Sequence, residues 1–381
     1  MEVIAGDYQK FNDELLDHSS FGKRFNKKGF LDDAIKDLLP QKKSLEKALI
    51  LYSHLQKHFN WTKRHDYFSS SSGREAYKKK EGTVADINFS LLAALREYGL
   101  EAQPVILSTR GHGTVHPIYP SYNEFNYVIV AIEIDGKMYL ADASSALPFD
   151  ELPLKCRNGK GWLVHEKNSR WIDLKRNSSY KKTSLIDFKI DENNISVNIN
   201  QQLKKYASYT KIDELNESTE SEIKEDLTSK YIDYELIKVE VNNKGYSTPL
   251  TLHYEFRQAL EDHKVIYLQP LFMGAINENP FSRETRDAPI DIPYQQQFNV
   301  ITTVEIPEGY AVEVPEQSFI KLPNEGGEFR FIIHHKGNKI TLSSSLKINQ
   351  TYFVNTEYAS IKQFYDLVSS KNNELIVLTK L

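Results

Sequence analysis

The stretch that decides the fold of the first half of this sequence is Gly82-Thr83-Val84-Ala85-Asp86, continued by Leu91-Leu92-Ala93-Ala94-Leu95-Arg96-Glu97-Tyr98-Gly99-Leu100. It predicts a helix over 84–98 with the leucines on its buried face. Thr83 is suited to cap this helix, since its hydroxyl can accept a hydrogen bond from an unpaired amide of the first turn. Asp86 suits the positive end of the helix dipole, and Gly99 provides a left-handed stop.

Around this helix the pattern changes from helices to strands. Further helices are predicted at 7–18, 31–39, 44–59 and 73–80, from apolar residues that recur with a helical period. Strands are predicted at 102–108, 125–134 and 137–141, the last two joined by a tight turn at Asp135-Gly136. We therefore expect a first domain at 1–178, with a helical lead-in over 1–42 and a core over 43–178.

The second half of the sequence consists mainly of short segments with strand-like patterns. Short β-rich runs separated by turn dipeptides are typical of a sandwich or an extended sheet. Two helices are predicted among them, at 219–232 and 357–370. The expected fold class is therefore α+β: a first domain followed by a mainly-β, sandwich-like domain at 179–381 that contains a C-terminal helix.

Composition excludes several classes of protein. The 381 residues carry 48 Lys and Arg against 52 Asp and Glu, a formal net charge of −4, so nucleic-acid binding has no electrostatic footprint. The apolar run 127–132 is too short to span a membrane. The start of the sequence lacks the basic and apolar regions of a signal peptide. A single cysteine, Cys156, excludes a disulfide framework and a thiolate metal cluster within one chain.

Three further segments accompany the helix in a recognisable order. Trp61 follows a helix that ends in an aromatic residue, and Phe125-Asn126-Tyr127-Val128 and Leu140-Ala141-Asp142-Ala143 lie on consecutive predicted strands. In this order and spacing, residues 43–145 resemble the transglutaminase-like superfamily, a branch of the papain-type cysteine-protease folds. That family carries Gly-x-Cys-x-Asp at the helix start, His on the second strand and Asp on the third. The matching positions here are Val84, Tyr127 and Asp142.

The resemblance implies a degenerate catalytic site. In the family, the helix dipole and an adjacent imidazolium stabilise a cysteine thiolate, and the carboxylate orients the imidazole. Valine has no nucleophilic atom, and a phenol with a pKa of about 10 is a poor base at neutral pH. We therefore expect no catalytic residues and no acyl transfer of the family type. Asp142 is expected to hydrogen-bond a neighbouring hydroxyl or amide, with the Tyr127 phenol as a candidate, and Cys156 is not expected to replace the nucleophile.

Candidate binding residues lie in the loop over 110–123, directly after it, and in the first turn of the helix that starts at Val84. They are Arg110, His112, His116, Tyr122, Asn126 and Asp86. Arg110 is suited to bind a carboxylate with two hydrogen bonds, or to brace the loop against Asp142 or Glu124. His112 and His116 have a spacing of four, but the glycines and Pro117 argue against a helix that would bring them together. We therefore expect no metal site and no cofactor.

The favoured function is non-catalytic: a peptide- or glycan-binding module, or a structural interaction module that engages a protein partner through the β domain. The alternative is a hydrolase or peptidase with a reorganised site around Asp142, His112 and His116, which requires both histidines within hydrogen-bond reach of Asp142.

Phe21-Gly22 follows an amphipathic helix, and this N-terminal stretch resembles the tail of a β-rich domain that precedes such modules in multidomain proteins of the Bacteroidetes type. The C-terminal half, with Pro280-Phe281, Arg286, Ile306-Pro307-Glu308-Gly309-Tyr310 and Phe364-Tyr365, resembles the β domain of unknown function that follows them. This implies that the chain is part of a longer exported protein of the periplasm or outer envelope.

Overall fold

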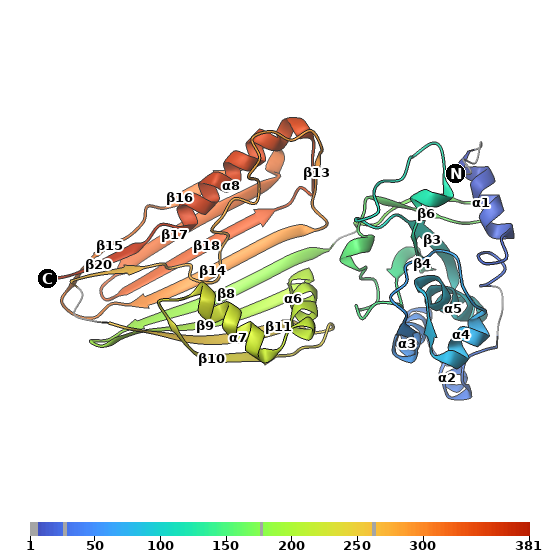
Figure 1. Cartoon of the computed structure of the whole chain (residues 1–381), viewed down its shortest axis with the longest axis horizontal. Helices are drawn as coiled ribbons and strands as arrows, with labels where there is room; N and C mark the ends of the chain where they lie inside the picture. Colours follow the sequence, from blue (N-terminus) through green and yellow to red (C-terminus); the bar gives the residue numbers. More distant parts are fainter. Residues whose placement is uncertain (1–6, 26–28, 176–177, 261–263) are drawn as a thin grey trace. The chain divides into compact units, whose positions relative to one another are not determined.

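The predicted helix at the centre of the first half is α5 (Val84–Glu97) in the computed structural model, which describes residues 7–25, 29–175, 178–260 and 264–381 (Figure 1). Every residue from Val84 to Leu95 is buried, so α5 is enclosed on all sides. The Thr83 hydroxyl accepts from the Asp86 amide, and the Asp86 carboxylate accepts from the Thr83 amide. This reciprocal pairing, a capping box, fixes the residue at which α5 begins.

The chain divides into two units, residues 1–176 (unit 1) and 177–381 (unit 2), each with its own hydrophobic core. The α+β class expected from the sequence is confirmed. Within the four described ranges, no helix combines the length and apolar character that crossing a bilayer requires.

Unit 1 surrounds α5 with helices and one antiparallel sheet. Its other helices are α1 (Tyr8–Asp17), α2 (Asp33–Leu38), α3 (Ser44–His58) and α4 (Gly73–Lys79). The sheet has the order β5-β4-β3-β6-β7, from β3 (Glu101–Leu107), β4 (Tyr127–Ile134), β5 (Lys137–Ala141), β6 (Lys160–Leu163) and β7 (Arg170–Asp173). Helices α3 and α4 pack against α5, which in turn packs against β3 and β4. The first half of α5 is held beside the start of β4 and the end of β5, since Asn88 hydrogen-bonds Val128 and Asp142.

A short parallel pair of strands brings a distant aromatic residue to the start of α5. Strand β1 (Asn60–Trp61) pairs with β2 (Glu81–Gly82), so Trp61 lies opposite Gly82. A Cβ atom at Gly82 would stand 2.8 Å from the Cβ of Asp86, closer than side chains normally approach. Glycine at this position therefore allows β2 to run directly into the capped helix.

In the described part of the chain, unit 2 is built on one extended sheet of eight strands. Of the two arrangements that the strand spacing favoured, a sandwich and an extended sheet, the structure has the extended sheet. The order is β10-β11-β9-β8-β14-β18-β17-β16. The strands are β8 (Ser179–Ile190), β9 (Asn194–Lys205), β10 (Glu235–Asn242), β11 (Leu250–Ala259), β14 (Gln295–Glu305), β16 (Ser318–Lys321), β17 (Gly327–Lys336) and β18 (Lys339–Ile348). Strands β8 and β14 are parallel, and the other neighbours are antiparallel.

Helices cover one face of this sheet in place of a second facing sheet (Figure 1). Alternate residues of β8, such as Ile186 and Phe188, are buried, whereas Leu185 and Asp187 face solvent. The covering helices are α6 (Tyr206–Glu217), α7 (Glu220–Lys230) and α8 (Tyr358–Asn372). Smaller sheets join β12 (Val265–Leu268), β20 (Ile376–Lys380) and β15 (Tyr310–Glu313), and β13 (Ile290–Asp291) with β19 (Tyr352–Phe353). The sequence analysis anticipated α7 and α8 but not α6.

Candidate functional site

Asp142, which directly follows β5, is completely buried and surrounded by hydrogen-bond donors. Its Oδ2 accepts from the Tyr127 hydroxyl at 2.8 Å. Its Oδ1 accepts from the Asn88 side chain at 2.9 Å, and from the amide and the hydroxyl of Ser144 at 3.0 and 2.6 Å. A buried carboxylate is stable only when it is paired or hydrogen-bonded in this way. The bond between Tyr127 and Asp142 that the sequence analysis put forward is present.

Asn88 connects this carboxylate to the helix and the sheet. Its side-chain amide donates to Asp142 and to the Val128 carbonyl, and its carbonyl accepts from the Ala143 amide at 2.9 Å. Asn88 lies on α5, Val128 on β4 and Ala143 after β5, so one side chain links three segments. Asp142 is thus part of the network that holds unit 1 together.

Tyr127 is a hydrogen-bond donor in this site. Burial, and next the charge of Asp142, raise the pKa of Tyr127 well above its usual value. The phenol therefore stays protonated at neutral pH, and a group that keeps its proton cannot act as a general base. Val84, at the first position of α5, is also completely buried.

Asp86 anchors the serine-rich segment that precedes α4. Its carboxylate accepts from the hydroxyls of Ser69 and Ser70 and from the amides of Ser70 and Ser71, at 2.7 to 3.0 Å, in addition to Thr83. Burial alone would raise the pKa of Asp86, but these hydrogen bonds outweigh burial and lower it. All of these contacts lie within unit 1, so they give Asp86 a structural role at the helix start.

Cys156 lies beside Tyr127 in this site, although it follows β5 by 15 residues in the sequence. It ends a short 3₁₀ turn, Leu154–Cys156, and its side chain is completely buried in hydrogen-bonding contact with Tyr127. Burial, followed by the charge of Asp142, raises the pKa of the Cys156 thiol well above its usual value. Because the thiolate is the reactive form, this arrangement disfavours nucleophilic chemistry at Cys156.

Aromatic and cationic side chains lie directly outside this buried network. The Trp61 and His65 rings stack at 5.4 Å, nearly parallel, and the His65 ring meets the Tyr127 ring edge-on at 5.3 Å. Lys155 Nζ donates to His65 Nε2 at 3.0 Å and lies 4.2 Å from the Trp61 ring centroid. Lys63 Nζ lies 5.1 Å from the same ring. We call Trp61, Lys63, His65 and Lys155 the cationic aromatic cluster.

Burial and the close approach of these side chains lower the pKa values of His65 and Lys155. Burial, and then the charge of Lys155, lower the pKa of His65. Burial also lowers the pKa of Lys155. His65 is exposed and Lys155 is half-buried, so the cluster forms an accessible surface above the buried pair of Tyr127 and Asp142.

The candidate residues of the loop have local partners. The Arg110 guanidinium donates to the Arg157 carbonyl at 3.0 Å. His112 Nε2 donates to the Asn123 carbonyl at 2.8 Å, and His116 Nδ1 accepts from the Ile118 and Tyr119 amides. Within the described residues, neither histidine hydrogen-bonds Asp142, whose partners are those given above. The geometry that the alternative hydrolase requires is therefore not formed in this structure.

Tyr122 and Asn126 also contact nearby segments of unit 1. The Tyr122 hydroxyl donates to Glu14 at 3.1 Å, and its ring packs 5.1 Å from Phe11 of α1. The Asn126 side chain binds both the amide and the hydroxyl of Thr109. These contacts join the loop to its surroundings, and neither residue belongs to the cationic aromatic cluster.

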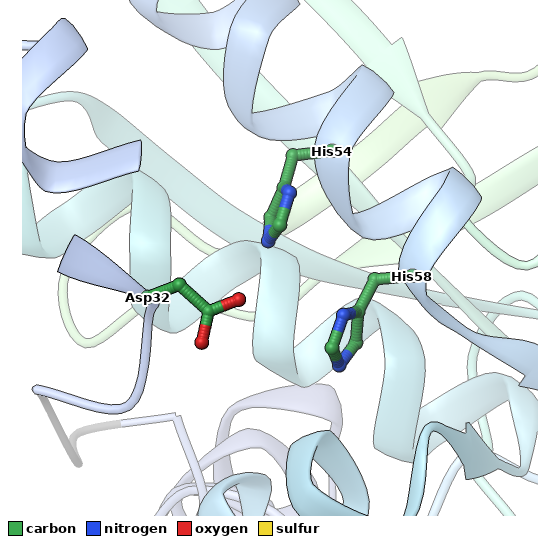
Figure 2. A group of neighbouring side chains, drawn as sticks. All are labelled: Asp32, His54 and His58. Atoms are coloured by element: carbon green, nitrogen blue, oxygen red, sulfur yellow. The ribbon is translucent and has the colours of Figure 1, made fainter. Parts of the chain in front are cut away.

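The sequence analysis missed two groups of side chains. One is the cationic aromatic cluster, whose signal was limited to Trp61. The other is Asp32, His54 and His58, whose ligand atoms lie within 4.8 Å of one another (Figure 2). Here the readable signal was the spacing of four between two histidines inside a predicted helix, which places both on one helix face. This second group is the arrangement in the described residues that could hold a metal ion.

Comparisons with known proteins agree with the fold and leave the activity open. Residues 264–378 match the model of DUF3858, a domain family of unknown function with a solved structure. No curated protein matches the sequence. A crystal structure of a proposed protease from Parabacteroides distasonis is similar, with a TM-score of 0.53 and 13% identity, over 97% of this chain. This chain spans 58% of that protein's length. At this identity the similarity shows the fold alone.

Proposed function

We propose that this chain is a catalytically inactive, transglutaminase-like protein that binds a peptide at the cationic aromatic cluster. Its place in the cell is the envelope, on the outer side of the cytoplasmic membrane, as the resemblance of its segments to exported multidomain proteins implies. The similarity to the solved Parabacteroides structure supports the fold part of this proposal. The match to DUF3858 supports the resemblance of the flanking β domain.

The buried hydrogen bond between Tyr127 and Asp142 is the observation that carries the proposal. The carboxylate that would orient a catalytic imidazole is instead occupied by a phenol, and both side chains are inaccessible to a substrate. Val84 offers no nucleophilic atom at the start of α5. Together Val84, Tyr127 and Asp142 favour a site that binds a ligand over a site that catalyses acyl transfer.

The cluster favours an acidic peptide over a neutral glycan. Two lysine side chains lie close to the Trp61 ring, and the neutral His65 ring extends the aromatic surface. Ammonium groups form charge-assisted hydrogen bonds with carboxylates, while an aromatic face packs against apolar or planar side chains. A peptide that carries a carboxylate next to such a side chain satisfies both parts of the cluster.

Calorimetric titration of the full chain with acidic peptides, their amidated neutral counterparts and neutral oligosaccharides tests the proposal. We expect binding of acidic peptides that is weakened by Trp61→Ala and by Lys155→Met. Lys160→Met, which removes an exposed lysine of β6, serves as the matched control and should bind like the wild type. The same mixtures are analysed by mass spectrometry for cleaved or transamidated products.

The outcomes separate the functions. Binding that depends on Trp61 and Lys155, without product, supports a peptide-binding module. Product that accumulates with turnover and disappears in Asp142→Asn contradicts catalytic inactivity. Equal binding by wild type and the Trp61→Ala variant contradicts the assignment of the cluster.

A further inference from the structure

Three side chains with metal-binding atoms converge beside α3, and none of them belongs to the cationic aromatic cluster. His54 and His58 stand one turn apart on α3, and their ring centroids are 5.5 Å apart. Asp32, the residue that precedes α2, approaches from the opposite side with its carboxylate pointing toward the imidazoles (Figure 2). The ligand atoms lie within 4.8 Å of one another. In a tetrahedral site with bonds of about 2.05 Å, ligand atoms are separated by about 3.4 Å, so small side-chain rotations complete it.

Tyr77 of α4 holds the three groups in position. Its ring stacks on His58 at 3.8 Å, its hydroxyl donates to Asp32 Oδ2 at 2.9 Å, and the same oxygen accepts from His54 Nε2 at 2.7 Å. An ion bound at His54 Nε2 replaces this hydrogen bond and requires the imidazole hydrogen on Nδ1. Its backbone carbonyl accepts from His58 Nε2 at 2.8 Å. A carbonyl can only accept, so His58 carries its hydrogen on Nε2 and presents an unprotonated Nδ1. Histidine ligands of metals commonly have this second hydrogen bond to a carbonyl.

The donor set determines the kind of ion. Two imidazoles and one carboxylate provide nitrogen and oxygen ligands with one negative charge, which is typical of zinc sites that leave a fourth position open. Hard cations such as calcium and magnesium prefer oxygen ligands throughout. Asp32 is exposed and both histidines are half-buried, so an ion can enter from solvent.

We propose that Asp32, His54 and His58 form a binding site for a divalent transition metal of the zinc type. The fourth position is taken by water or by the Tyr77 oxygen. The ion joins the segment before α2 to α3, and thereby fastens the helical lead-in to the core of unit 1. The site shares no residue with the cationic aromatic cluster, so each can be altered without removing a side chain of the other.

The test uses the full chain after treatment with a chelator. Calorimetric titration with Zn²⁺ should show one tight site per chain, and Co²⁺ should give the visible absorption bands of a tetrahedral complex. His54→Gln and His58→Gln should each weaken Zn²⁺ binding by more than the roughly 10- to 100-fold that loss of a merely orienting partner costs. His112→Gln is the matched control, since His112 belongs to a pair with the same spacing of four outside any helix.

Circular dichroism first establishes that each variant is folded, and Asp32→Asn, on an exposed residue, provides a variant with little structural risk. Wild-type binding that both histidine variants and Asp32→Asn abolish supports the site. Two results overturn it: a wild type that binds Zn²⁺ no more tightly than the His54→Gln variant, or a loss of affinity in His112→Gln equal to that in His54→Gln.

Discussion

Replacing Tyr127 with phenylalanine removes one hydroxyl from the centre of unit 1, and we expect a loss of stability without a change of fold. The deleted group donates to Asp142 Oδ2 at 2.8 Å, and both side chains are completely buried. Asp142 keeps its bonds with Asn88 and Ser144. Hydrogen bonds to charged groups contribute about 1.5–3 kcal/mol each. At roughly 2–4 °C for each kcal/mol, the melting temperature of unit 1 should fall by about 3–12 °C.

Urea unfolding and differential scanning calorimetry measure this loss. Tyr119→Phe is the matched control, because Tyr119 is 65% exposed and its hydroxyl should matter by less than about 0.5 kcal/mol. A double-mutant cycle with Asp142→Asn should show that the two changes are not additive, since they remove parts of one interaction. A loss for Tyr127→Phe no larger than that for Tyr119→Phe would refute the role of this bond.

Three further predictions concern single side chains. Hydrogen bonds lower the folded-state pKa of Asp86, so the stability that its carboxylate contributes is present above about pH 3.9 and is lost as the pH falls further. The difference in unfolding free energy between wild type and Asp86→Asn, measured by urea unfolding, should therefore become smaller in acid, and a difference that stays constant would contradict this. Burial lowers the pKa of Lys182 to about 8, so folding releases a proton between about pH 8 and 10.4 and the free energy of unfolding should rise with pH in this range. The difference in unfolding free energy between wild type and Lys182→Met should change over the same range, and a difference that does not depend on pH would contradict the lowered pKa. The Cys156 thiol should react with a disulfide reagent far more slowly in the folded chain than in urea, and equal rates would show that it is not buried.

Local sequence patterns sufficed for the helices of unit 1 and for β3, β4 and β5, whereas the short strands β1, β2, β6 and β7 were not predicted. The capped start at Thr83, the glycine after α5 and the turn at Asp135-Gly136 are features of neighbouring residues, and the structure has α5, β4 and β5 close to their predicted bounds. The sheet of unit 2 depends on distant pairings instead. Strand β8 pairs in parallel with β14, and no local pattern specifies that partner. Helix α6 was missed because Tyr and Thr in its first half have low helix propensity, and its packing on β8 and β9 stabilises it.

The candidate site was predictable where the chain follows the order of the resembled fold. Tyr127 begins β4 and Asp142 directly follows the adjacent strand β5, so their hydrogen bond could be expected from sequence. His65 and Lys155 enter from a loop and a 3₁₀ turn outside that order, and their approach to Tyr127 is visible only in three dimensions. The two histidine pairs also show that sequence spacing predicts side-chain geometry only where the secondary structure is known. His54 and His58 share a helix face, whereas the equal spacing of His112 and His116 falls in a loop and brings no common ligand position.

The most direct test of the central claim is the pKa of a cysteine restored at position 84. In a Cys156→Ala background, the double variant Val84→Cys, Tyr127→His is alkylated with iodoacetamide over a range of pH, and its folding is checked by circular dichroism. If Val84 and Tyr127 occupy the positions of the nucleophile and base, the helix start, the new imidazole and Asp142 should lower the thiol pKa well below the usual value of about 8.5. Adding Asp142→Asn should raise it again. A thiol pKa at or above about 8.5 in the double variant would contradict the assignment of these positions.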